Sequence, residues 1–146
     1  MNSEPIITKQ TYAAQRDLVW AALTDPAQMR QWYFEEMPDF KLEVGFETEF
    51  NVRCEDRDFL HVWKVTKAIA ETKNAYRWRY DGYTGDSLVT WELAAADDNE
   101  GSTQLKFTHA ILEPFPPDDP IFSREACQGG CNYFLNERLK PFLEDR

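Results

Sequence analysis

Residues 123–144, SREACQGGCNYFLNERLKPFLE, form the stretch that decides the fold. Its apolar side chains recur at steps of three and four, which places them on one stripe of a helix: Cys127, Cys131, Phe134, Leu135, Leu139, Phe142 and Leu143. Ser123 is the expected N-cap, because its hydroxyl can accept a hydrogen bond from a backbone N–H of the first turn. We therefore predict a long C-terminal helix whose apolar face needs a partner.

Two features of this predicted helix are unusual. Gly129 and Gly130 lie inside it, and each glycine costs about 1 kcal/mol relative to alanine in a helix interior. Pro141 is expected to kink or fray the last turn, because proline lacks the backbone N–H donor. Glycines on the contact side of a helix either allow a close approach or leave room beside the helix.

The middle of the chain predicts the partner of this helix. Six consecutive segments alternate between apolar and polar residues, with short polar turns between them: residues 40–44, 50–54, 59–65, 76–80, 89–93 and 105–111. This pattern indicates an antiparallel meander with one apolar face and one solvated face. Before the meander, residues 6–12 predict a first strand, and residues 16–23 and 27–32 predict two short helices. Asp25 and Pro26 suit the start of the second helix.

Together these elements predict an α+β fold. We expect a curved antiparallel sheet of about seven strands that wraps around the long C-terminal helix, with the two short helices after the first strand. The length of 146 residues suits a single domain, residues 1–146. A curved sheet leaves space beneath the helix unless large side chains fill it.

The net charge and the cysteine content limit the classes of partner and the cellular location that we expect. The net charge of -10 repels phosphate backbones, and no basic stripe is present, so we expect no nucleic-acid partner. No apolar run approaches the roughly 18 residues needed to span a bilayer, so we expect no membrane insertion. Three cysteines, Cys54, Cys127 and Cys131, in a chain without a signal peptide predict reduced thiols and a cytoplasmic location.

Several motifs resemble a known family. The sequence VWAALTDP at residues 19–26, followed by Trp32, resembles the first-helix signature of the homologues of the activator of the ninety-kilodalton heat-shock chaperone's ATPase, the AHSA-like family. Residues 103–109 are similar to the last strand of that family, and residues 130–144 to its closing helix. The order of elements resembles the helix-grip fold of the START and birch-pollen-allergen-like (SRPBCC) superfamily. The resemblance runs over nearly the whole chain.

This resemblance implies an intracellular ligand-binding domain, because members of the wider superfamily bind lipids, sterols and polyketides, and a minority are cyclases or other enzymes. The family usually has a tryptophan directly after the helix glycine, where this chain has Cys131. Pro141 also stands where the family generally has an ordinary helix former. The smaller thiol is expected to leave either open volume beside Gly130 or a ring moved in to fill it.

The candidate ligand-binding residues come from the inward phase of the strands and from the helix stripe: Trp63, Trp78, Tyr80, Trp91, His109, Cys131, Phe134 and Arg138. The aromatic rings can pack the core, form a pocket wall, or do both. His109 is either a hydrogen-bonded core residue or a polar spot in an apolar chamber, and His61 shares its phase. Arg138 could reach a ligand carboxylate or extend to solvent.

We expect no metal, no cofactor and no catalytic residues. Cys127 and Cys131 are four residues apart, without the tight pair that structural zinc sites use. Paired carboxylates are missing from the inward phase.

Three hypotheses remain open. The first is a protein that binds a small hydrophobic or amphipathic molecule. The second is a protein-interaction or co-chaperone-like module, which an exposed aromatic patch near residues 32–34 would favour. The third is a polyketide cyclase-like enzyme that uses His109 with a pocket tyrosine. A homodimer through the first strand and the last helix is also open.

Overall fold

The structure is a computed structural model that describes residues 5–38, 40–54, 57–95, 101–116, 118–119 and 122–144. Its elements follow one another in this order: β1 (Ile6–Tyr12), α1 (Arg16–Thr24), α2 (Pro26–Trp32), β2 (Glu47–Cys54), β3 (Arg57–Ile69), β4 (Lys73–Tyr80), β5 (Asp86–Ala95), β6 (Thr103–Glu113), α3 (Arg124–Asn132), the π-helical stretch η2 (Tyr133–Leu139) and α4 (Lys140–Glu144).

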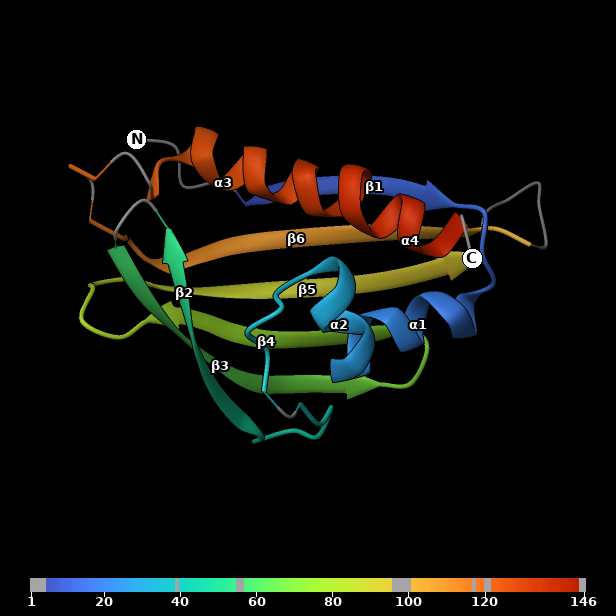
Figure 1. The fold of residues 1–146 in the computed structure, drawn as a ribbon, viewed down its shortest axis with the longest axis horizontal. Coiled ribbons are helices and arrows are strands. Elements are labelled where there is room, and N and C mark those ends of the chain that lie inside the picture. Colours follow the sequence, from blue (N-terminus) through green and yellow to red (C-terminus); the bar gives the residue numbers. More distant parts are fainter. Residues whose placement is uncertain are drawn as a thin grey trace.

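One antiparallel sheet organises the molecule, with the strand order β1-β6-β5-β4-β3-β2. The C-terminal helical segment runs along the β1 side of this sheet, and α1 and α2 lie over the middle of it (Figure 1). α3 and α4 contact β1, α1 contacts β5, and η2 contacts α2. The predicted helix-grip arrangement, with a curved sheet, two short helices after the first strand and a long C-terminal helix, is confirmed.

The sheet has six strands rather than about seven, because residues 40–44 do not form a strand. Phe40 is buried against Trp63 and Tyr76, whereas Val44 is 69% exposed. Gly45 turns the chain at φ +94°, and only from there does the backbone join β3: the Gly45 N–H donates to the Val65 carbonyl at 2.8 Å. The apolar residues of this stretch thus fill the core from a loop, without a strand ladder.

Both predicted helix caps are present. The Asp25 carboxylate accepts a hydrogen bond from the Ala27 N–H at 3.0 Å, and the Ser123 hydroxyl accepts one from the Ala126 N–H at 3.1 Å. Each side chain pairs a backbone donor that the first turn of a helix leaves open.

The C-terminal helical segment is not regular along its length. The π-helical stretch η2 ends at Leu139, two residues before Pro141, whose ring would meet the carbonyl four residues earlier in a regular α-helix. Leu135, Leu139 and Leu143 are buried and anchor the segment to the core. The Tyr12 hydroxyl donates to the Leu135 carbonyl at 2.9 Å, which ties η2 to β1. Across the part of the chain that the structure describes, no helix is long and apolar enough to cross a membrane.

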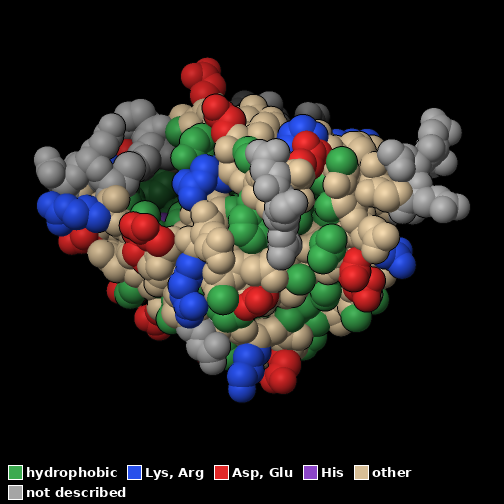
Figure 2. Space-filling model, turned by 45° about the vertical axis from the view of Figure 1, so that its right-hand side comes forward, with side chains coloured by type: hydrophobic (Ala, Val, Ile, Leu, Met, Phe, Trp, Pro, Cys, Tyr) green, Lys and Arg blue, Asp and Glu red, His purple; other side chains and the backbone are tan. Residues whose placement is uncertain are grey.

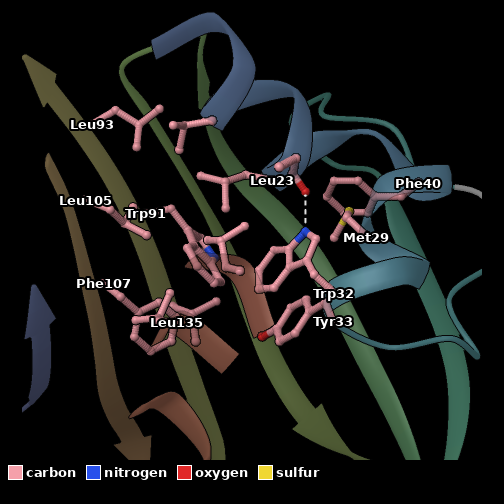
Figure 3. Packing of buried hydrophobic residues seen from close by; sticks show 14 of the residues in the cluster. Leu23, Met29, Trp32, Tyr33, Phe40, Trp91, Leu93, Leu105, Phe107 and Leu135 are labelled. Atoms are coloured by element: carbon pink, nitrogen blue, oxygen red, sulfur yellow. Dashed lines mark hydrogen bonds between the residues drawn. The ribbon is translucent and has the colours of Figure 1, made fainter. Parts of the chain in front are cut away.

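The core lies between the sheet and the helices, and the end of α2 supplies two of its rings. Trp32 is 1% exposed, and its indole N–H donates to the Ala22 carbonyl at 2.8 Å (Figure 3). Tyr33 is 7% exposed and stacks on Trp32 with a centroid separation of 4.7 Å. Phe34 is half-buried. The exposed aromatic patch at residues 32–34 that would have favoured the protein-interaction hypothesis is therefore not present.

Candidate ligand pocket

A pocket of about 200 Å³ lies between the sheet and the C-terminal helical segment. Figure 2 shows a hollow floored by hydrophobic side chains toward the left of the molecule, on the side where Figure 1 has α3. The sheet forms one wall of the pocket, and α3 with η2 forms the opposite wall. Tyr33 and Phe34, which follow α2, line it as well.

The strand register explains the sheet wall. Val89 pairs with His109, and Trp91 pairs with Phe107, on the neighbouring strands β5 and β6. Residues two apart on a strand point to the same face, so all four side chains reach the pocket together. β3 adds His61, and β4 adds Trp78 and Tyr80 by the same alternation.

The helix wall contains small side chains where it faces the sheet. Cys127, Gly130 and Cys131 line the pocket from α3, and Phe134 lines it from η2. Apart from the backbone of its own helix and its chain neighbours, a Cβ atom built on Gly130 would meet no atom of the described residues within 4 Å. Open volume beside Gly130 is therefore what the structure shows, and no ring has moved in to fill it.

A second pocket of about 180 Å³ adjoins the first one. Four side chains line both pockets: His61, Tyr80, His109 and Cys127. Phe115 and Phe122 line only the second pocket. They stack on each other with centroids 5.5 Å apart. Both histidine side chains thus lie at the junction of the two spaces.

Six of the predicted site residues line the main pocket: Trp78, Tyr80, Trp91, His109, Cys131 and Phe134. Trp63 does not line it, because Trp63 is fully buried behind Trp78, with ring centroids 4.9 Å apart.

Arg138 also lies outside the pocket wall. Its guanidinium donates to the Gln31 carbonyl at 2.8 Å and to the Tyr133 hydroxyl at 3.2 Å. These contacts hold the charge near the outer side of η2, away from the aromatic wall.

Tyr33, Phe34, Phe107 and Cys127 line the pocket but were not predicted for it. Phe107 shares the strand phase of His109, so the alternation itself was an available signal. Tyr33 and Phe34 had a weaker signal, an aromatic run directly after a capped short helix. Nothing local in that run distinguishes a surface patch from a pocket wall.

The two histidines of the pocket are uncharged at neutral pH. Burial lowers the pKa of His61 to about 4, and it lowers the pKa of His109 to about 4 as well. Nδ1 of His61 lies 2.9 Å from the Phe59 carbonyl oxygen, which can only accept, so Nδ1 carries the hydrogen and Nε2 the lone pair. Nε2 of His109 is buried and has no hydrogen-bond partner among the described residues.

The other titratable groups of the wall are also neutral. Burial raises the pKa of Cys131 to about 12, and it raises the pKa values of Cys127, Tyr33 and Tyr80. Among the residues that the structure describes, the lining includes no Lys, Arg, Asp or Glu. This described part of the wall therefore carries no formal charge at neutral pH.

The residues of the pocket wall also show which possible catalytic and metal-binding groups lie together. His109 and Tyr80 both line the pocket, and none of the described lining residues is a carboxylate. Within the described ranges, no three His, Cys, Asp or Glu side chains are grouped as a metal site requires. Cys127 and Cys131 are free thiols, and the side chain of Cys54 lies outside the described part of the structure.

A family model described as "Activator of Hsp90 ATPase homolog 1-like protein" matches residues 13–144 of this chain. None of the curated proteins compared with the chain matches it.

Three solved structures illustrate the likeness of the fold. Mll3558 from Rhizobium loti has a TM-score of 0.80 at 20% identity, and the match covers 96% of each chain. The Aha1 dimer from Colwellia psychrerythraea has a TM-score of 0.71 at 19% identity, again over 96% of each chain. DynU16, from the dynemicin biosynthetic locus, has a TM-score of 0.76 at 20% identity over 97% of this chain and 48% of its own. This chain thus spans about half the length of DynU16, and these likenesses show the fold alone.

Proposed function

The chain belongs to the family of Activator of Hsp90 ATPase homolog 1-like proteins, and from that premise we propose that it binds a small apolar or amphipathic molecule in the pocket between the sheet and the C-terminal helix. The open space beside Gly130 carries this proposal. Protein interiors are normally filled to the density of organic crystals, so an aromatic-lined space left open is a candidate ligand site. Burial of the ligand's apolar surface drives binding, at about 25 cal/mol per Å² before the costs of association.

Two neighbouring glycines allow a matched test. Gly130 lines the pocket, whereas Gly129 is exposed, and a Cβ atom meets open space at both positions. Gly130→Leu places a branched side chain in the pocket, and Gly129→Leu places the same side chain in solvent. Neither substitution is expected to weaken the helix, because leucine is a better helix former than glycine by about 1 kcal/mol.

The measurement is a fluorescence titration with phenylnaphthylamine, a neutral dye that brightens in apolar surroundings. The wild-type protein and Gly129→Leu are expected to bind it equally, and Gly130→Leu is expected to lose binding. Equal binding by all three proteins would place the dye elsewhere and would reject the pocket as the site.

A protein-interaction role is the second candidate, and the family match favours it. The aromatic residues 32–34, whose exposure would have favoured this role, are largely buried, so the contact would have to involve another face. The test is the ATPase rate of the purified ninety-kilodalton chaperone with and without this protein. An unchanged rate at saturating protein would remove this candidate.

A further inference from the structure

We propose that the occupant of the pocket is an uncharged aromatic alcohol of about two fused rings, whose hydroxyl group pairs with Nε2 of His109. This inference rests on the proposed function and adds the chemical class of the ligand. Three properties of the pocket lead to it: the shape of the wall, one unpaired polar atom and the lack of charge.

The shape of the wall favours a small, flat molecule. Rings approach the pocket from three sides, with Trp91 and Phe107 on the sheet, Tyr33 after α2 and Phe134 on η2. Aromatic rings pair well with another ring in an offset stack or edge to face. The volume of about 200 Å³ is below the range typical for drug-sized ligands, which points to about two fused rings.

The unpaired polar atom sets the position of the polar group. The side chain of His109 lines both pockets, and its Nε2 atom is buried and has no hydrogen-bond partner among the described residues. A buried polar atom without a partner is costly, so a ligand that pairs it gains affinity. A hydroxyl group can donate and accept, so it satisfies Nε2 in either tautomer of the imidazole.

The lack of charge excludes anionic ligands. The lining residues that the structure describes include no Lys or Arg, and the guanidinium of Arg138 is held outside by Gln31 and Tyr133. A carboxylate in this pocket would lose its hydration and find no counter-ion. The net charge of -10 adds a long-range repulsion of anions.

The experiment compares three probes of the same ring system by isothermal titration calorimetry at neutral pH: naphthalene, naphthol and naphthoate. The wild-type protein is expected to bind naphthol about tenfold more tightly than naphthalene, as one additional hydrogen bond provides. It is expected to bind naphthoate more weakly than naphthol by on the order of a hundredfold, because the charge must be desolvated.

Two substitutions of His109 test whether this residue makes the hydrogen bond to the hydroxyl group of the ligand. His109→Leu is expected to bind naphthol and naphthalene equally, because the polar atom is removed. His109→Gln keeps an uncharged group that can donate and accept, so it is expected to keep the preference for naphthol. Near-ultraviolet circular dichroism checks that each variant is folded. The comparison of the three probes on the wild-type protein does not depend on the variants.

Each failure has a different meaning. If the wild-type protein binds naphthoate as tightly as naphthol, the claim about charge is overturned while the pocket remains a ligand site. Equal affinities of the wild-type protein for naphthol and naphthalene would mean that water already satisfies His109, which overturns the hydroxyl contact. Absence of binding for all three probes would reject the proposed function itself.

Discussion

The rings of Tyr33 and Phe134 meet edge to face, with their centroids 4.8 Å apart and their planes at 87°. Tyr33 follows α2 and Phe134 belongs to η2, so the contact joins two segments that are far apart in the sequence. Both rings also line the pocket. Together with the contact between the rings of Phe34 and Phe134, whose centroids are 5.2 Å apart, it holds the helix wall against the segment after α2.

Removing the Phe134 ring tests this contact. We expect Phe134→Ala to lower the free energy of unfolding by about 2 kcal/mol, since the ring is half-buried, and to enlarge the pocket. Tyr133→Ala is the control, because Tyr133 is the adjacent residue, is 42% exposed and does not line the pocket. We expect it to cost less than about 1 kcal/mol. Urea denaturation measures both values, and equal losses would contradict the role of Phe134.

Gly85, which lies against the second-pocket residue Phe115, is expected to be irreplaceable. A Cβ atom on Gly85 would lie 2.8 Å from the Cα atom of Phe115, whereas Gly82 has open space around it. Both glycines have positive φ, so alanine is strained at each by roughly 1 kcal/mol. Thermal and urea unfolding should therefore show a clearly larger loss for Gly85→Ala than for Gly82→Ala. Equal losses would mean that Phe115 moves aside freely.

Arg138 is expected to contribute to stability and not to ligand affinity. Its guanidinium contacts Gln31 and Tyr133 and is partly exposed, so Arg138→Met should cost no more than about 1 kcal/mol. Affinity for naphthol should stay the same in the calorimetric titration. A tenfold loss of affinity would instead show that a ligand reaches this side chain.

The two buried histidines predict that the free energy of unfolding falls as the pH is lowered. The folded-state pKa values of His61 and His109 are about 4, below the ordinary value of 6.5, so the unfolded chain binds protons first as the pH falls. Their contribution to stability is complete above pH 6.5 and is lost between pH 6.5 and 4, by about 3 kcal/mol for each ring. The other titratable groups of the pocket wall keep their protons in this range, because burial raises their pKa values: Tyr33, Tyr80, Cys127 and Cys131.

Urea denaturation across this pH range checks that prediction. His109→Gln has no group to protonate there, so it should lose about 3 kcal/mol less than the wild-type protein on going from neutral pH to pH 4. Identical pH profiles for the two proteins would show that His109 is not a buried neutral imidazole.

The fold was largely predictable because local patterns and the global arrangement agree. The period-two alternation located β2 to β6, and the helical stripe located the C-terminal segment with its Ser123 cap. The prediction was wrong at residues 40–44, where three alternating apolar residues are too few to distinguish a strand from a loop that inserts Phe40 into the core. The turn at Gly45 decides this, and it depends on a backbone contact to Val65.

The pocket was predictable only where it follows strand phase. Trp78, Tyr80, Trp91 and His109 are inward because their strands alternate. Trp63 has the same phase, but the neighbouring rings of Phe50 and Tyr76 bury it behind the wall. Arg138 was predicted as a ligand-binding residue but does not line the pocket. Its position beside the helix stripe does not reveal which way a long side chain extends. Such choices depend on tertiary packing, which one sequence does not display.

The measurement that tests the central claim most directly is a crystal structure of the protein with bromonaphthol, whose bromine is located by its anomalous scattering. We predict one bromine between α3 and the sheet, with the hydroxyl of the ligand within hydrogen-bonding distance of His109 Nε2 and no bromine there in Gly130→Leu. A wild-type crystal that holds the ligand only on the outer surface, with the space beside Gly130 filled by the protein's own side chains, would contradict the account.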